Sequence, residues 1–286
     1  MSDPGLLGEI ERFYDALPRH RGVAESVGPL VVFGPGERSW SYYVRPAIGA
    51  TDITARDVDA ARAHRRERGL AESFEWVHET TPSLRAAAVD SGLEVLEHPL
   101  MVLRGALPPA GPVGVRLHRL TADDPDLARA MAVAHVGFGA PGTAPGTAGP
   151  AERDAAAAEI DLIPTRAALA DGWLTSVAAY DDDGPLSVGS AQSALGVTEV
   201  VGVATLPSAR RRGLAGAVTA ELVALRSAAG STTVFLSADD DDVARLYRSL
   251  GFERVATACI AEPAEVGDIS RWRRPARIDR RAGDGP

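Results

Sequence analysis

The stretch LPSARRRGLAGAV, residues 206–218, combines three arginines and two glycines at the end of an apolar run. Apolar residues recur at helical spacing from Leu214 onward, which predicts that a helix begins within this stretch. A helix start leaves about four backbone N–H groups unpaired and carries about half a positive charge, so it can bind an anion. The small residues leave the approach open, and the arginines add planar charged donors that suit phosphate oxygens. We expect a pyrophosphate-binding turn, the alternative being a solvated basic turn that merely starts a helix; its residues are Arg210, Arg211, Arg212, Gly213, Leu214, Ala215 and Gly216.

A second stretch, DDDVARLYRSLGF at residues 240–252, has the pattern of a short amphipathic helix. Val243, Tyr247 and Leu250 fall on one face, the acidic residues suit the positive helix start, and a glycine suits the helix end. On spacing alone, Tyr247 is a core aromatic residue. A chemical role for its hydroxyl needs a further argument from the motif around it.

The segment ALPPAGPVG, residues 106–114, interrupts helices and central strands with its prolines and glycines. It predicts a linker between a first domain, residues 1–105, and a second domain, residues 115–262, with a flexible tail at residues 263–286. In the second domain, the patterns predict strands at 115–120, 173–180, 186–195, 198–206, 232–238 and 253–262 and helices at about 124–136, 152–170, 211–228 and 240–250.

The two domains look like copies of one fold. Placing Gly251 over Gly92, an offset of 159 residues, aligns a strand, a helix, a glycine cap and a second strand. The residues that suit anion binding are missing from the first copy, which has Gly49 for Arg210, Asp52 for Gly213 and Ala88 for Tyr247. We therefore expect the first domain to be non-catalytic and to shape or cover the site of the second.

The composition of the chain argues against nucleic-acid-binding, disulfide-linked and membrane-spanning proteins. A net charge of −9 argues against nucleic-acid binding and suits a cationic or amine-bearing small substrate. The single cysteine excludes a disulfide within the chain, and no run approaches the roughly 18 apolar residues of a membrane span. With no secretory pattern in MSDPGLLGEI, we expect a cytoplasmic protein that does not bind membranes.

Other phosphate and metal motifs are weak or missing. The chain has no lysine and hence no Walker-type phosphate loop. Gly137, Gly139 and Gly142 form a G-x-G-x-x-G pattern, but it follows a predicted helix, whereas a dinucleotide fingerprint follows a strand. The histidines and acidic runs lack metal-ligand spacing, so no metal is expected.

The two motifs together resemble the GNAT (Gcn5-related N-acetyltransferase) family. RRRGLA at 210–215 is similar to the family's [QR]-x-x-G-x-[GA] loop, and residues 241–252 are similar to its N-x-x-A-x-x-L-Y-x-x-x-G-F motif. The resemblance covers about residues 113–262, and the first half resembles a degenerate second domain, as in tandem members. It implies an α/β fold with a mixed sheet, built from two tandem GNAT-like acyl-CoA N-acyltransferase domains.

The resemblance also implies roles for single residues. The strand before the loop would bind the pantetheine arm and acetyl carbonyl through the backbone of Val203, Ala204 and Thr205. Tyr247 would be the general acid toward the CoA sulfur, and Glu199 the general base, although Glu199 is alternatively an exposed residue at a strand start. Ala244 and Asp241 match positions of the second motif and would contact the acyl-CoA. Asp241, however, replaces an asparagine and lacks its amide donors, which favours helix capping.

These roles predict an enzyme that transfers an acyl group from acetyl-CoA, or another acyl-CoA, directly to a primary amine of a small molecule. The alternative is a non-catalytic acyl-CoA-binding regulatory module that has lost turnover. Glu199 together with Tyr247 favours the enzyme. The chain is expected to be a monomer or a homodimer.

Overall fold

The computed structural model describes residues 3–20, 22–36, 40, 42–104 and 114–264 of the chain. Almost all of the expected linker, 106–114, and of the expected tail, 263–286, lies outside these residues. Strands from both halves form one mixed eight-stranded sheet, in which β9 and β10 are parallel and all other neighbours antiparallel. In spatial order its strands are β4 (Phe74–Val77), β11 (Phe252–Pro263), β5 (Leu93–Leu103), β10 (Thr233–Ser237), β9 (Val197–Thr205), β8 (Gly184–Ala194), β7 (Leu174–Asp181) and β6 (Arg116–Leu120).

The two halves exchange their last strands. Strand β5 of the first half lies between β10 and β11 of the second, and β11 lies between β4 and β5. The offset of 159 residues superposes β4 on β10 and β5 on β11, so the repeat is confirmed and the exchange is mutual. The domain limits at 105 and 115 stay a prediction, since the two halves are hydrogen-bonded into one sheet.

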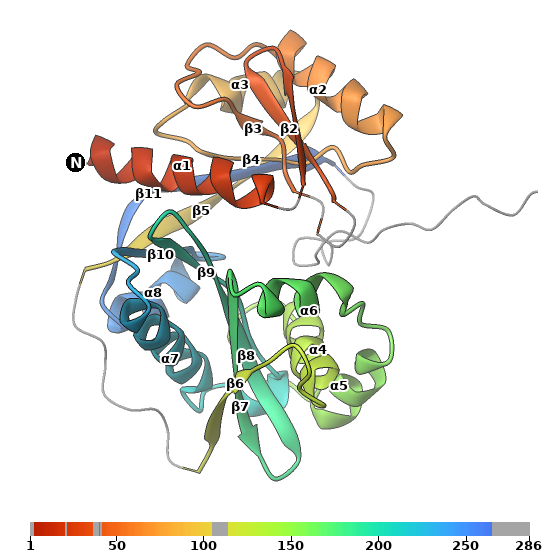
Figure 1. Ribbon diagram of the computed structural model, residues 1–286, viewed down its shortest axis with the longest axis vertical. Coiled ribbons are helices and arrows are strands. Elements are labelled where there is room, and N and C mark those ends of the chain that lie inside the picture. The colour runs from red at the N-terminus through yellow and green to blue at the C-terminus, as the bar shows by residue number, and fades with distance from the viewer. Residues whose placement is uncertain (1–2, 21, 37–39, 41, 105–113, 265–286) are drawn as a thin grey trace, which may run out of the picture.

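Helices from both halves of the chain pack around this sheet (Figure 1). The second half carries α4 (Leu127–Phe138), α5 (Pro150–Ala157), α6 (Ile163–Ala170), the short 3₁₀ turn η1 (Pro207–Ala209), α7 (Leu214–Ala228) and α8 (Asp241–Ser249). The first half carries α2 (Ala55–Glu67), α3 (Ser83–Asp90) and a small sheet of β1 (Val23–Val27), β2 (Leu30–Gly34) and β3 (Arg45–Pro46). The repeat also superposes α2 on α7 and α3 on α8.

Helix α1 (Pro4–Arg19) ties the halves together. The side chain of Asp3 accepts hydrogen bonds from the first backbone N–H groups, and a proline occupies the first turn, so the helix start is fixed locally. Its apolar face is buried in a cluster that includes Phe235 of β10 and Val197 of β9. Although α1 opens the first half, it therefore packs on the sheet of the second.

Two predicted helices are wrong in their extent. The helix expected at 152–170 is two helices, α5 and α6, separated by residues 158–162. Pro164 stands in the first turn of α6, where its missing N–H costs nothing, whereas inside a continuous helix it would clash with the preceding turn. The helix expected at 211–228 begins later, at Leu214, because Gly213 is its N-cap.

The shared sheet predicts that both halves unfold together. Met101 on β5 is fully buried in the core cluster of the second half, so Met101→Ala should cost about 2–5 kcal/mol of unfolding free energy. Denaturant unfolding followed by circular dichroism and tryptophan fluorescence should give one coincident transition at a lower midpoint. The exposed Val89→Ala is the control; two separate transitions would show that the halves are independent.

Candidate active site

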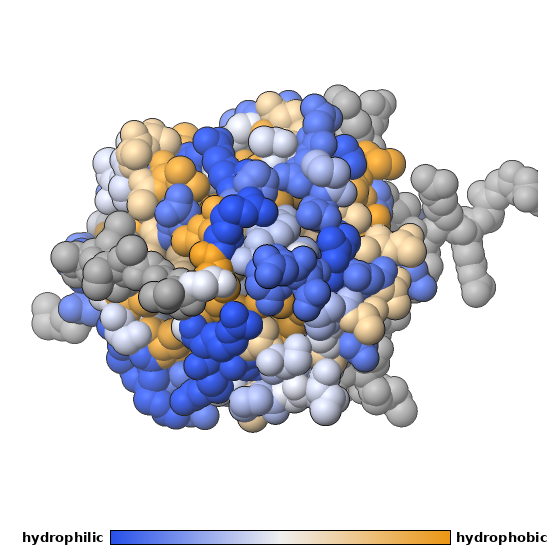
Figure 2. All heavy atoms as spheres, turned by 90° about the horizontal axis from the view of Figure 1, so that it is seen from below, coloured by the Kyte–Doolittle hydropathy of each residue, from blue (hydrophilic) through white to orange (hydrophobic). Residues whose placement is uncertain are grey.

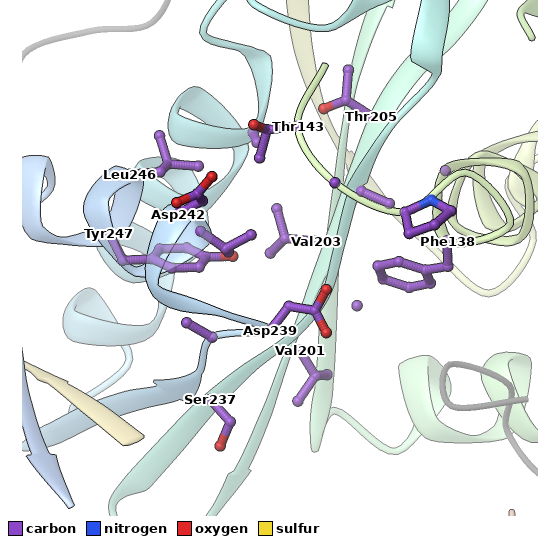
Figure 3. A pocket seen from close by; sticks show the side chains of 18 of the residues that line it. Phe138, Thr143, Val201, Val203, Thr205, Ser237, Asp239, Asp242, Leu246 and Tyr247 are labelled. Carbon is purple, nitrogen blue, oxygen red and sulfur yellow. The ribbon is translucent and has the colours of Figure 1, made fainter. Parts of the chain in front are cut away.

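A cavity of about 1300 Å³ lies beside strand β9. It is bordered by the start of α7, by α8, and by the end of α4 with the loop that follows (Figure 3). The first half contributes Tyr43, Glu75, Leu96 and His98 to its lining. The cavity is therefore lined by residues from both halves of the chain.

Strands β9 and β10 separate next to this cavity. They are paired only over Val197–Glu199 and Thr233–Phe235, whereas β9 remains paired with β8 as far as Thr205. Gly202, at φ +63°, lies where the register between β8 and β9 shifts, as in a bulge that adds a residue to one strand. The edge of β9 that faces away from β8 thus has backbone groups available beyond Glu199. Val203, Ala204 and Thr205, which the sequence assigns to backbone contacts, all line the cavity.

The start of α7 is open toward the cavity. Gly213 is its N-cap at φ +76°. Among the described residues, no side chain caps the first turn, and a β-carbon at Gly213 would meet no atom within 4 Å. Gly213, Leu214, Ala215 and Gly216 all line the cavity. The unpaired N–H groups of the first turn and the positive end of the helix dipole can therefore reach an anion in the cavity.

The corresponding helix of the first half is closed in the same place. At the start of α2, the hydroxyl of Thr54 accepts a hydrogen bond from the backbone of Asp57, and the Asp57 carboxylate accepts one from the backbone of Thr54. This capping box occupies the helix start with a carboxylate. An anion is therefore favoured at α7 and disfavoured at α2.

The three arginines of the predicted turn differ in their surroundings. The Arg210 guanidinium donates hydrogen bonds to the carbonyl oxygens of Gly137 (2.8 Å), Ala140 (2.6 Å) and Ala144 (3.1 Å). Arg211, in a left-handed conformation at φ +65°, lines the cavity. Arg212 is exposed and is not one of the lining residues. Arg210, which also lines the cavity, thus holds the loop after α4 against the turn, and Arg211 is the second arginine of the turn at the cavity.

The G-x-G-x-x-G pattern at residues 137–142, which does not fit a dinucleotide fingerprint, has a structural role. A β-carbon on Gly137 would lie 3.0 Å from the β-carbon of Ala204 and 3.1 Å from the carbonyl oxygen of Thr205. The glycine therefore allows the end of α4 to approach β9. Gly137, Gly139 and Gly142 line the cavity. The sequence analysis missed this contribution because it tested the pattern only for dinucleotide binding.

The hydroxyl of Tyr247 points into the cavity from α8, opposite the end of α4 (Figure 3). Its ring packs edge-on against Phe252, so Tyr247 is at once a core aromatic and a lining residue. Asp241 and Ala244, from the same motif, do not line the cavity. Ala244 is fully buried in the core, and the exposed Asp241 lies 3.9 Å from Arg248.

The capping expected of Asp241 is made by its neighbour. Asp240 is the N-cap of α8, and its carboxylate accepts a hydrogen bond of 2.8 Å from the backbone of Val243. The carboxylate of Asp241 instead lies near arginine side chains. The assignment slipped by one residue because four consecutive aspartates at 239–242 leave the helix start ambiguous in sequence.

The part of β9 that lines the cavity runs from Glu199 to Thr205, so Glu199 lies at the end away from the turn. Glu199 is buried, which rules out the alternative that it is an exposed residue at the start of a strand. Its Oε1 accepts a hydrogen bond of 2.9 Å from the hydroxyl of Tyr14 on α1. Arg45 places its guanidinium carbon 3.5 Å from the centre of the Tyr14 ring and forms an ion pair with Glu75. A buried polar cluster therefore joins β9 to α1, β3 and β4.

The cluster changes the proton affinity of its members. Burial raises the pKa of Glu199 to about 8, and the Glu75 carboxylate adds to the effect, whereas the Tyr14 hydrogen bond and the Arg45 charge oppose it. Burial likewise raises the pKa of Tyr14 and of Tyr43. Glu199 can thus gain and lose a proton near neutral pH, the range that suits a general base.

The sequence analysis missed Tyr14, Tyr43, Arg45 and Glu75. One signal was available: Glu75 interrupts the apolar strand FEWV as Glu199 interrupts its own strand. What the sequence did not contain was the pairing, since these residues lie more than a hundred positions from Glu199 and come near it only in the folded chain.

Metal-binding groups and membrane-spanning helices bear on the class of site. Within the described ranges, no group of three or more histidine, cysteine or acidic side chains is arranged to hold a metal ion. None of the helices in those ranges combines the length and apolar character that crossing a bilayer requires. On the face seen from below, hydrophobic patches are interrupted by hydrophilic residues (Figure 2).

Part of the chain matches a known protein family, and the whole chain resembles solved structures. Residues 191–261, which include β9, the turn and α8, match the family described as FR47-like protein. No curated protein matches the chain. A solved GCN5-related N-acetyltransferase from Kribbella flavida is 26% identical with a TM-score of 0.67, the match covering 92% of this chain and 98% of that one.

Two other solved structures share the fold at lower identity. A putative acetyltransferase of the GNAT family from Novosphingobium aromaticivorans is 19% identical, with a TM-score of 0.56 and coverage of 92% of this chain and 100% of that one. A tandem GNAT protein from the clavulanic acid biosynthesis pathway is 14% identical, with a TM-score of 0.53 and coverage of 83% and 79%. The tandem arrangement expected from the repeat is thus found in a solved structure.

The buried carboxyl group predicts how stability depends on pH. The pKa of Glu199 in the folded chain, about 8, lies above its ordinary value of 4.5, so the folded state binds the extra proton between these values. This contribution to stability is complete below about pH 4.5 and is lost as the pH rises through about 8. Glu199→Gln cannot ionise, so its melting temperature should fall less between pH 6 and 9 than that of the wild type.

The exposed Glu253→Gln is the matched control and should follow the wild type. Calorimetry at a series of pH values measures both. Parallel curves for Glu199→Gln and the wild type would show that Glu199 ionises at its ordinary pKa.

Proposed function

The chain belongs to the GNAT family, and from this we propose that it is an acetyl-CoA-dependent N-acetyltransferase that acetylates a primary amine of a small molecule. One observation carries the proposal: the open start of α7, the free edge of β9, Glu199 and Tyr247 all line one cavity. An anion-binding end and a proton-transfer end are thus joined by a strand edge that can hold an extended thioester.

We assign the donor to the part of the cavity along β9 and α7. The pyrophosphate would accept hydrogen bonds from the backbone of residues 213–216, with Arg211 beside it. The pantetheine arm would pair with the edge of β9 that β10 leaves free. These are backbone contacts, so Val203, Ala204 and Thr205 serve by position and not by side-chain type.

The reaction we propose is direct transfer. Glu199 takes a proton from the acceptor ammonium, and the amine nitrogen attacks the thioester carbonyl carbon. A backbone N–H of β9 stabilises the oxyanion, the carbon–sulfur bond breaks, and Tyr247 donates its proton to the departing thiolate. The attacking nitrogen, which is positively charged after the attack, releases its second proton to the Tyr247 phenolate, and the proton held by Glu199 passes to solvent. The first half supplies Tyr43, Glu75, Leu96 and His98 to the side of the cavity where the acceptor would bind.

A non-catalytic acyl-CoA-binding module is the second candidate. It would use the same donor contacts but would not need a titratable carboxyl group and a tyrosine hydroxyl in one cavity. The two are separated by turnover: acetyl-CoA is incubated with a panel of primary amines, and free CoA is followed with a thiol reagent. CoA release that depends on an amine supports the enzyme; tight binding without release supports the module. A cytoplasmic location and a monomeric or homodimeric state remain expectations.

The donor contacts predict the effect of closing the turn. Gly213→Asp places a carboxylate against the bound pyrophosphate and forces an aspartate into a left-handed conformation, so acetyl-CoA affinity should fall more than tenfold, or about 1.4 kcal/mol. Calorimetric titration measures it. Gly69→Asp is the matched control, because Gly69 is also left-handed and open but lies in the first half, in RERGLA. Equal affinities for the two folded variants would rule out the turn as the pyrophosphate site.

The acid role predicts a separation of binding from chemistry. Tyr247→Phe keeps the ring that packs on Phe252 and removes the proton, so kcat should fall about 100-fold while acetyl-CoA affinity stays the same. Steady-state kinetics and calorimetry on one preparation measure both. An unchanged kcat would leave Tyr247 a core residue only.

A further inference from the structure

The first half of the chain donates a hydrogen bond to the proposed base. Tyr14 lies on α1, 185 positions from Glu199, and donates a buried hydrogen bond of 2.9 Å to its Oε1. Of the two carboxyl oxygens of Glu199, it is Oε1 that accepts a hydrogen bond from a side chain among the described residues. Because Glu199 lines the cavity, Oε2 is the oxygen left to meet a ligand there.

The Tyr14 ring is held from several sides. It packs edge-on against Phe235 of β10, with ring centres 5.4 Å apart, and lies tilted against the Phe13 ring, with ring centres 5.6 Å apart. The guanidinium of Arg45 stacks on the ring and is itself fixed by its ion pair with Glu75. A side chain confined in this way loses little further entropy when its hydroxyl orients a neighbour.

We propose that Tyr14 is a positioning residue for the acetyl-transfer reaction: its hydroxyl fixes the Glu199 carboxyl group so that Oε2 faces the acceptor amine. The proposal rests on the proposed function of Glu199 as the base. It gives the first half a defined part in the chemistry of the second, beyond covering the cavity.

The charges around Glu199 set the sign of the expected effect. Charged and titratable groups from several elements around Glu199 act on this cluster. They are Tyr14 and Glu11 of α1, Tyr43 just before β3, Arg45 of β3, Glu75 of β4 and Glu262 of β11. His98 of β5 lines the same cavity. A hydrogen bond from Tyr14 favours the ionised carboxylate and lowers the pKa of Glu199. Removing only that hydroxyl should therefore raise the pKa further.

The test is Tyr14→Phe in the full-length chain, which keeps the ring and its contacts with Phe235 and Arg45. With the best amine of the panel, we expect kcat to fall at least tenfold at pH 7, the KM for acetyl-CoA to be unchanged, and the acid limb of the pH–rate profile to move to higher pH. Tyr180→Phe is the control, because the buried Tyr180 hydroxyl has no hydrogen-bond partner among the described residues. A Tyr14→Phe profile that coincides with the wild-type profile would overturn the proposal.

A second measurement does not depend on turnover. In protein carrying glutamate labelled with carbon-13 at the side-chain carboxyl, the Glu199 signal is identified by its loss in Glu199→Gln and titrated by NMR. Tyr14→Phe should raise its apparent pKa, and an unshifted titration overturns the positioning role even if the wild type acetylates amines. If the titration shifts but turnover does not depend on Glu199, the proposed base fails and the proposal falls with it, for a reason distinct from the first.

Discussion

The structure depends on the separation of β9 from β10 beyond Glu199. A strand interior normally satisfies its backbone groups on both sides, and leaving them unpaired in a closed interior is costly. Beyond Glu199, β9 is paired on one side only, and a cavity occupies the other. The open helix start, the loop held by Arg210 and the Tyr247 hydroxyl are all arranged around that free edge. A ligand that supplies both a phosphate and an amide-rich extended arm would satisfy all of them together.

The exchange of strands explains why the chain retains a half that lacks the open turn. Strand β5 fills the position between β10 and β11, so the sheet that carries β9 and α8 is incomplete without the first half. Helix α1 adds apolar packing on Phe235 and the hydrogen bond to Glu199. The first half therefore contributes to the shared sheet and to the cavity, although its own helix start is closed by Thr54 and Asp57.

Local features could be predicted from sequence because they arise from neighbouring residues. The strand–turn–helix at 197–228 follows from apolar periodicity and Gly213, and the repeat fixes the matching elements of the first half. The break between α5 and α6 was missed because alanine-rich helical periodicity concealed the effect of Pro164. The bonds of Arg210 to carbonyl groups, and the Tyr14–Arg45–Glu75 cluster, could not be predicted, because they depend on which distant elements meet when the strands exchange.

We propose that this tandem chain has one donor site, at the start of α7, and that its first half serves that site without binding a donor of its own. Calorimetric titration of the full-length protein with acetyl-CoA should give a stoichiometry of one acetyl-CoA per chain, as this arrangement requires. Two equivalent sites per chain would contradict it, as would no binding by protein that is folded and free of co-purified CoA.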